Sequence, residues 1–116
     1  MSRKKQKKRS RKCLSGHDSH HILHYRRNWS KGFKQQLRRS FIYDLPITVH
    51  QELHAIVPPV PPLDEEEARW LWTQFKAVDH DMSLFEALEW LQLHAPNAEF
   101  AMAIMAQYGF LRNKMG

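Results

Sequence analysis

The spacing of apolar residues divides the chain into four stretches. Residues 2–12 contain no apolar residue, residues 13–56 hold short mixed runs, and residues after 63 repeat apolar positions every three or four residues. A stretch without apolar residues cannot bury a core, whereas the regular repeat is typical of amphipathic helices. We therefore predict a disordered basic tail over residues 1–12, a first folded unit over 13–56, a proline-rich linker over 57–63 and a helical segment over 64–116.

The segment 64–116 predicts three helices. Their apolar stripes are Ala68, Leu71, Trp72, Phe75 and Val78, then Leu84, Leu88 and Leu91, then Phe100, Ala101, Ile104, Met105 and Tyr108. Ser83 with Glu86 has the spacing of a capping box, in which two side chains satisfy free amides at a helix start. Asn97 is expected to cap the third helix and Gly109 to end it.

The first folded unit mixes strand and helix patterns. Residues 20–25 are apolar and aromatic enough for a strand, and residues 41–43 begin a second β-favouring run. Residues 33–39 are basic, with two apolar residues four apart, and predict a short helix. Thr48 is expected to be the N-cap of a further helix. The chain is therefore expected to be an α+β protein.

The sequence bears on location in three ways. No uninterrupted apolar run is long enough to span a membrane, and no apolar signal-peptide core follows the basic N-terminus. The one cysteine, Cys13, rules out an intrachain disulfide and suits a reducing compartment. We expect a cytoplasmic protein without a membrane partner.

Charge is unevenly divided between the two halves of the chain. Residues 1–56 hold 14 Lys and Arg against 3 Asp and Glu, a net charge of +11, whereas residues 57–116 hold 4 against 9, a net charge of −5. A basic surface favours a polyanionic partner, and nucleic acid is the simplest one. The basic tail fits non-specific phosphate contact, or alternatively a solvated segment that aids solubility.

Histidines are the main chemical feature of the basic half, where six of the eight lie between residues 17 and 54. His50 and His54 are four apart and would share one face of a helix, whereas the adjacent His20 and His21 would point to opposite faces of a strand. This pattern predicts three imidazoles around a divalent metal and a fourth left free as a base. A unit of about forty residues seldom holds together by its apolar core alone, so a metal would also stabilise it.

Residues 13–56 resemble the HNH endonucleases, also called His-Me finger or ββα-metal endonucleases. The resemblance rests on the pair His20-His21 after a strand-like segment and on the HxxxH pair of His50 and His54. It implies a small ββα-metal finger in which His20, His50 and His54 bind one divalent ion (zinc, magnesium, manganese or nickel) and His21 is the general base. It also implies hydrolysis of phosphodiester bonds in nucleic acid, DNA before RNA. A short basic protein of this kind is compatible with a phage or a mobile element, in which case we expect it in the host cytoplasm.

Six basic residues of this half are candidate phosphate contacts: Arg26, Arg27, Lys31, Lys34, Arg38 and Arg39. A guanidinium can contact two phosphate oxygens at once, which suits the scissile and flanking phosphates. The chain departs from the family at one position. Where the family carries an asparagine, about nine residues before the first helix histidine, this sequence has Ser40-Phe41.

A second interpretation keeps the metal and the basic face but not catalysis. In it the protein is a nucleic-acid-binding regulator, or an accessory or inhibitor of a larger nucleoprotein machine, and the acidic helical segment binds a protein partner. Trp70, Trp72 and Trp90 would suit such an interface, since aromatic residues are enriched at interfaces. Alternatively the tryptophans stabilise the helices, or the acidic helices cover the basic face of the same chain.

Overall fold

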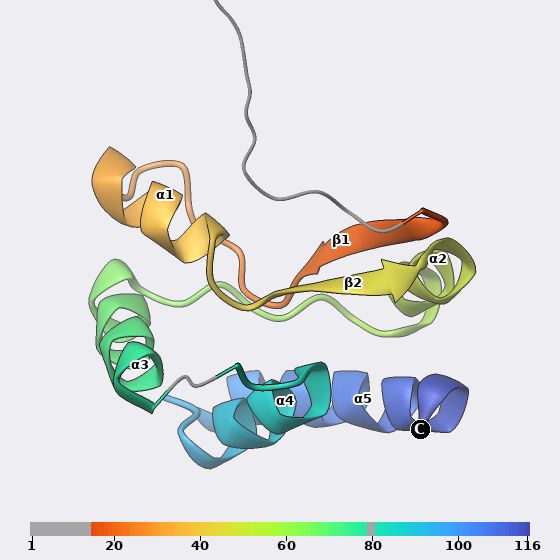
Figure 1. The fold of residues 1–116 in the computed structure, drawn as a ribbon. Helices are drawn as coiled ribbons and strands as arrows, with labels where there is room; N and C mark the ends of the chain where they lie inside the picture. Colours follow the sequence, from red (N-terminus) through yellow and green to blue (C-terminus); the bar gives the residue numbers. More distant parts are fainter. Residues whose placement is uncertain (1–14, 79–80) are drawn as a thin grey trace, which may run out of the picture.

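The computed structural model describes residues 15–78 and 81–116, and in these residues the chain is a small α+β fold (Figure 1), as predicted. The elements follow in the order β1 (His17–His21), α1 (Lys31–Arg38), β2 (Ile42–Pro46), α2 (Ile47–Ile56), α3 (Glu65–Val78), α4 (Leu84–Leu93) and α5 (Ala98–Met115). The predicted basic tail and Cys13 lie outside the described residues. None of the helices in the described ranges is long and apolar enough to cross a membrane.

The two strands form one antiparallel pair, with His21 opposite Ile42 at its inner end. Gly16 turns the chain into β1 with a φ of 74°, a conformation that glycine adopts without strain. Phe41, just before β2, has a left-handed φ of 55° and so interrupts the extended partner strand at this point. The predicted strand over residues 20–25 is therefore wrong in position, because β1 starts earlier and its pairing ends at His21.

Helix α2 follows β2 without a loop. Pro46 is its N-cap residue, and no side chain caps the helix start. The predicted N-cap, Thr48, lies instead in the first turn and is exposed. This prediction is wrong because Pro46, whose ring restricts φ to near −65°, already leads into the helix two residues earlier. The buried residue of α2 is Leu53.

Helices α3, α4 and α5 confirm the three helices predicted after the linker. The capping box at the start of α4 is complete, because Glu86 N–H donates to Ser83 Oγ at 3.1 Å and Ser83 N–H donates to Glu86 Oε1 at 2.8 Å. Asn97 caps α5 in the predicted way, with its Oδ1 accepting from Phe100 N–H at 2.8 Å. Local polar signals thus fix the starts of both helices.

Gly109 does not end α5, so the prediction of a C-terminal cap there is wrong. The helix continues to Met115, and its later turns bury Leu111 completely. Glycine inside a helix costs about 1 kcal/mol relative to alanine, whereas burying a leucine side chain contributes about 2 kcal/mol. The apolar contact outweighs the effect of the glycine.

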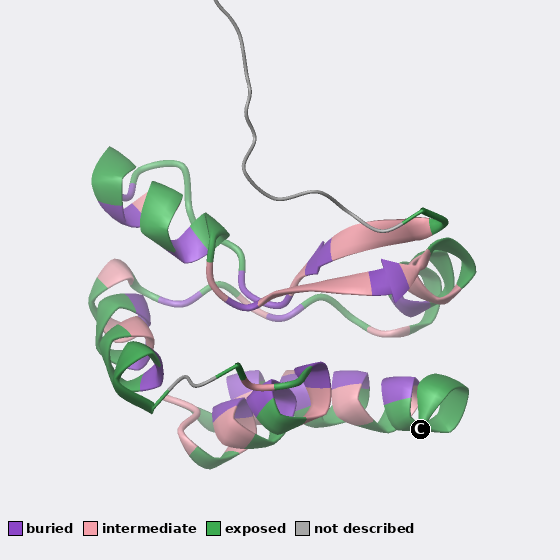
Figure 2. Ribbon diagram, in the orientation of Figure 1, coloured by how far each residue is buried: buried purple, intermediate pink, exposed green. Residues whose placement is uncertain are grey.

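One hydrophobic cluster runs through the described residues, from Ile22 after β1 to Leu111 in α5. Figure 2 shows many of the buried positions on the facing sides of the β1–β2 pair and the α4–α5 pair. The proline-rich linker has no helix or strand, yet its Val60 and Leu63 are buried in the same cluster. The linker therefore contributes to the core.

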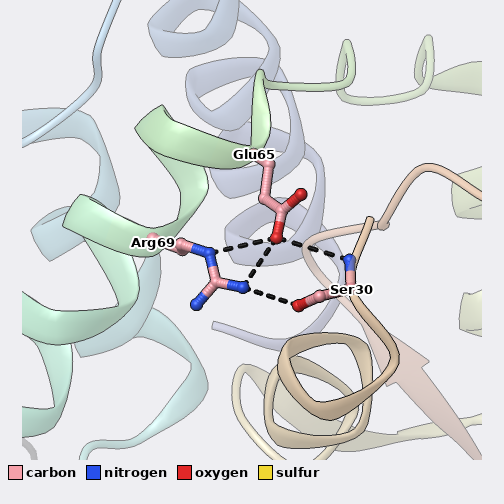
Figure 3. A network of polar contacts seen from close by, with 3 residues as sticks. All are labelled: Ser30, Glu65 and Arg69. Atoms are coloured by element: carbon pink, nitrogen blue, oxygen red, sulfur yellow. Dashed lines mark hydrogen bonds and ion pairs between the residues drawn. The ribbon is translucent and has the colours of Figure 1, made fainter. Parts of the chain in front are cut away.

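A polar network joins the loop before α1 to α3 (Figure 3). Arg69 donates to Glu65 Oε2 from Nε at 3.0 Å and from Nη2 at 2.7 Å, and Nη2 also donates to Ser30 Oγ at 2.6 Å. The guanidinium lies 4.5 Å from the centroid of the Phe33 ring. Phe33 and Leu37 form the buried face of α1, as predicted. These contacts hold α1 against α3.

Candidate metal site

Three histidines converge where β1 meets α2. His20 comes from β1, and His50 and His54 come from successive turns of α2. One ring nitrogen of each lies within 4.8 Å of the others, and the ring centroids are 4.5 to 5.9 Å apart. The predicted grouping of these three residues is therefore confirmed. It arises because the i, i+4 spacing places both α2 histidines on one face of the helix, opposite the strand.

His20 is the most buried member of the group, with 2% of its surface exposed. Its Nε2 lies 2.7 Å from Gln107 Oε1. A carbonyl oxygen can only accept, so Nε2 carries the hydrogen and Nδ1 keeps a bare lone pair. This Nδ1 is buried without a hydrogen-bond partner among residues 15–78 and 81–116. A bare buried acceptor is costly, and a cation would satisfy it.

His50 is oriented by a carboxylate. Its Nδ1 donates to Asp18 Oδ2 at 3.2 Å, and its Nε2 lies 2.9 Å from His54 Nε2. Because His50 Nδ1 carries the hydrogen given to Asp18, His50 Nε2 accepts and His54 Nε2–H donates in this contact. A bound cation would take the place of that hydrogen. Histidines that bind metals commonly donate their second N–H to a carboxylate or carbonyl oxygen. Asp18 and Gln107 occupy that role for His50 and His20.

The environment keeps His20 and His54 in the neutral form that binds cations. The pKa of His20 is lowered to about 4, mainly by burial and also by the neighbouring His50 and His54, against the raising effect of the Gln107 hydrogen bond. Burial, followed by the nearby His50 and His24, also lowers the pKa of His54. Neutral imidazole is the form that coordinates metals. Both rings are therefore ready to bind a cation at neutral pH.

A cavity of about 250 Å³ opens beside the three histidines. His20, His54 and Gln107 line it, together with His21 and His24. Residues 57–60 of the linker supply its apolar part together with Ile22 and Leu53. The predicted base, His21, therefore borders the same cavity as two of the candidate ligands.

A second cavity, of about 340 Å³, lies next to the first. Its lining residues are His21, Leu23, His24, Tyr25 and Arg38. His21 and His24 line both cavities, so the two spaces adjoin at these imidazoles. The second cavity has a basic and aromatic lining, in contrast to the apolar wall that the linker gives the first.

Of the six predicted phosphate contacts, Arg38 lines one of these two cavities. The other five, four of them exposed and Lys34 half-buried, lie in the loop between β1 and α1, on α1 or just after it: Arg26, Arg27, Lys31, Lys34 and Arg39. Lys34 Nζ donates to Arg27 O at 2.9 Å. Arg38 is therefore the one of the six that borders a described cavity of the site, and contact of all six with phosphate stays a prediction.

Three residues of the site were not predicted from the sequence. Asp18 is two residues before His20 on β1, so strand alternation places both side chains on one face. This alternation identifies Asp18 only when the strand is placed over residues 17–21 instead of 20–25. His24 follows the His20-His21 pair by three residues, but it lies beyond β1 and no periodicity places it. Gln107 is 87 residues from His20. No local pattern links that glutamine to a histidine on a strand.

The acidic helices carry an exposed groove on another part of the molecule. The groove has a volume of about 530 Å³ and is lined by Glu66, Glu67 and Trp70 of α3, by Leu93 and by residues 94–96. Trp70 is 51% exposed and Leu93 is 82% exposed.

The other two tryptophans of the predicted interface are turned into the fold. Trp72 Nε1–H donates to Ser40 Oγ at 2.9 Å, and Trp90 lies 5.3 Å from the Phe75 ring and stacks on His94 at 4.1 Å. Trp70 is the member of the three that a partner could reach.

No family model matches this chain, and no curated protein or solved structure matches it either. The grounds for a function are therefore the residues and their arrangement. The strongest of these is the histidine group of β1 and α2 with its bare nitrogen.

Proposed function

We propose that this protein is a divalent-metal-dependent endonuclease of the HNH type that hydrolyses phosphodiester bonds in DNA. The observation that carries the proposal is the grouping of His20, His50 and His54, with one ring nitrogen of each within 4.8 Å of the others. The buried Nδ1 of His20, which has no hydrogen-bond partner among the described residues, adds to it. Three imidazoles are a frequent donor set for zinc and similar ions. The order of an antiparallel strand pair followed directly by α2 supports a ββα-metal finger.

In this proposal His20, His50 and His54 hold one ion. A bound divalent ion would supply positive charge that stabilises the negative charge developing on phosphate oxygens. His21 takes the proton from the water that attacks phosphorus, a task that suits a neutral imidazole near neutral pH. The bond from phosphorus to the leaving sugar oxygen breaks, and that oxygen takes a proton from solvent.

In this proposal six basic residues between β1 and β2 bind the substrate. They are Arg26, Arg27, Lys31, Lys34, Arg38 and Arg39. Guanidinium and ammonium groups hold phosphates through charge-assisted hydrogen bonds. Each such contact releases counterions from the nucleic acid, so affinity falls as the salt concentration rises.

Phe41 stands where the resemblance expects an asparagine that braces the hairpin. Its carbonyl accepts from Ile22 N–H at 3.0 Å, and its ring centroid lies 4.0 Å from that of Phe75. The backbone hydrogen bond and the ring contact together fix this end of the strand pair. We propose that they replace the bracing asparagine in this chain.

The activity is tested by incubating supercoiled plasmid with the protein and Mg²⁺, Mn²⁺, Ni²⁺ or Zn²⁺. Nicking by the wild type that His21→Ala abolishes is the expected result. His94→Ala, which removes a half-buried histidine at the end of α4, is the matched control and should nick normally. Equal nicking by wild type and His21→Ala would show that His21 is not the base.

The metal site is tested separately by elemental analysis of the purified protein after dialysis against each metal. About one ion per chain is expected for the wild type and for His94→Ala, and a large loss is expected for His50→Ala. Finding no bound ion, and no change in melting temperature when metal is added, would remove the basis of the proposal.

One observation favours a non-catalytic alternative. The groove at Trp70 and Leu93 offers exposed apolar surface with the carboxylates of Glu66 and Glu67 at its side, which suits the protein-binding segment of a regulator or inhibitor. In that case the metal stabilises a nucleic-acid-binding scaffold. Retained metal and DNA binding without nicking by any of the four metals would favour this alternative.

A further inference from the structure

The second cavity is the strongest unassigned feature of the basic half. Its volume of about 340 Å³ falls within the usual range for small-molecule sites, about 300 to 1,000 Å³. None of its lining residues is acidic: they are His21, Leu23, His24, Tyr25 and Arg38. A cavity of this composition attracts an anionic ligand with an apolar or aromatic part.

Tyr25 offers the aromatic surface. It is 40% exposed, and Lys34 Nζ lies 5.6 Å from its ring centroid. Lys34 is itself fixed by donating to Arg27 O at 2.9 Å. The cation therefore occupies one face of the ring, and the exposed remainder is available for a planar group to stack on it.

Arg38 offers the charge. It lies in the last turn of α1 and is exposed, and it forms no ion pair with any residue in the described ranges. A guanidinium without a protein carboxylate nearby can direct its donors to a phosphate. The ring and the guanidinium line one cavity, so a single ligand can contact both.

We propose that this cavity binds one unpaired nucleotide of a nucleic-acid strand, with its base stacked on Tyr25 and its phosphate on Arg38. The inference rests on the proposed function, because His21 and His24 join this cavity to the one beside the candidate metal ligands. A base inside a duplex is stacked on both faces and cannot stack on a side chain without leaving the helix. The substrate is therefore single-stranded or locally unpaired nucleic acid.

The test measures binding of fluorescein-labelled oligonucleotides to the full chain by anisotropy, in a chelator so that no cleavage occurs. We expect tighter binding of a twelve-nucleotide oligo-dT than of a duplex of the same length. Tyr25→Ala should weaken binding of the single strand by about tenfold to a hundredfold and change binding of the duplex little. Tyr25→Phe keeps the ring and should bind like the wild type.

Arg38→Ala provides a second test in the same assay. Its binding of the single strand should weaken, and the slope of log affinity against log salt should become shallower by about 0.7, the value for one phosphate contact on a single strand. Trp70→Ala removes an exposed aromatic ring from the acidic helices and is the matched control, with no expected effect. Unchanged single-strand affinity in both Tyr25→Ala and Arg38→Ala would overturn the proposal.

Two further measurements separate this inference from the nuclease. Metal content of Tyr25→Ala should equal that of the wild type, since Tyr25 is not among the candidate ligands. If the wild type nicks plasmid but Tyr25→Ala binds single strands normally, the subsite is wrong while the enzyme stands. If dTMP alone displaces the oligonucleotide as effectively as unlabelled oligo-dT, the cavity is a mononucleotide site and binding of a strand is overturned.

Discussion

The two ring nitrogens of His20 lie in different environments. Nε2 donates to Gln107 Oε1, whereas Nδ1 is buried without a hydrogen-bond partner among the described residues. Because the imidazole is 2% exposed, protonating it in the folded chain would place a charge in a poorly solvated place. The same arrangement that leaves a lone pair for a cation thus makes the metal-free protein sensitive to acid.

The metal-free protein should lose stability as pH falls from about 6.5 to about 4. The pKa of His20 is lowered from 6.5 to about 4 in the folded chain, so the unfolded chain binds more protons between these values. The contribution is fully present above pH 6.5 and lost by pH 4, and amounts to about 3 kcal/mol. Urea unfolding at a series of pH values, with chelator, measures it.

His20→Leu is the comparison for that experiment. Without the imidazole, the free energy of unfolding should depend much less on pH across the same window. The lowered pKa of His54 acts in the same direction, with burial as its main cause, and leaves a smaller residual dependence. A wild-type profile that is flat between pH 6.5 and 4 would mean that His20 is not held neutral by burial.

Gln107→Leu should weaken metal binding by about tenfold to a hundredfold, the usual effect of losing a group that orients a metal ligand. The change removes the acceptor of His20 Nε2–H, so the ring is no longer held with Nδ1 free. Competition with a chromophoric chelator at pH 7 measures the affinity. Gln74→Leu, at an exposed position of α3, is the control. Wild-type affinity in a folded Gln107→Leu would exclude this role.

The site residues differ in how far sequence can predict them. His50 and His54 follow from helical spacing, and His20 from its pairing with His21. Asp18 follows from strand alternation once β1 is placed correctly. Gln107 depends on the packing of α5 against the hairpin end of the fold. Such a contact is set by tertiary structure, which no local period encodes.

Helix starts and ends follow local chemistry when no stronger contact competes. Ser83 and Asn97 cap α4 and α5, as the sequence predicts. Thr48 is displaced as a cap by the proline before it, and Gly109 lies inside a helix that continues to bury Leu111. Glycine inside a helix costs about 1 kcal/mol, so the burial of Leu111 outweighs Gly109 in α5.

Ser83→Ala should lower the free energy of unfolding by about 1 kcal/mol, because it removes the acceptor of the capping box. Thr48→Ala is the matched comparison and should change the free energy by less than about 0.5 kcal/mol, since an exposed position without a special contact is usually near neutral. Chemical denaturation of both variants measures the difference. Equal losses would show that Thr48 does stabilise the start of α2.

At the scale of the molecule, apolar packing joins segments that the sequence separates. The linker reads as a stiff spacer because it holds four prolines in seven residues, yet Val60 and Leu63 are buried in the common cluster. An ion pair of 3.1 Å between Glu52 and Lys114 also connects α2 to α5. Proline predicts the backbone of such a segment but not which of its side chains meet a core.

Loss of the Phe75 side chain should affect both the β1–β2 pair and the α4–α5 pair. It is 2% exposed, and its ring centroid lies 4.0 Å from that of Phe41 and 5.3 Å from that of Trp90. Truncating a buried phenylalanine costs about 3 to 5 kcal/mol. We therefore expect Phe75→Ala to reduce stability by that amount and to weaken protection of the β1–β2 pair and of the α4–α5 pair together.

Hydrogen exchange followed by mass spectrometry resolves the two parts of the chain, because it reports opening free energies segment by segment. Phe110→Ala, at a half-buried position of α5, is the control and should lower the free energy of unfolding by less than Phe75→Ala.

Metal at a hundred times its dissociation constant should add about 2.7 kcal/mol to the stability of the folded state. Since Gln107 of α5 holds His20, that increase should extend to α5. Protection confined to β1, β2 and α2 would mean that the two parts unfold separately.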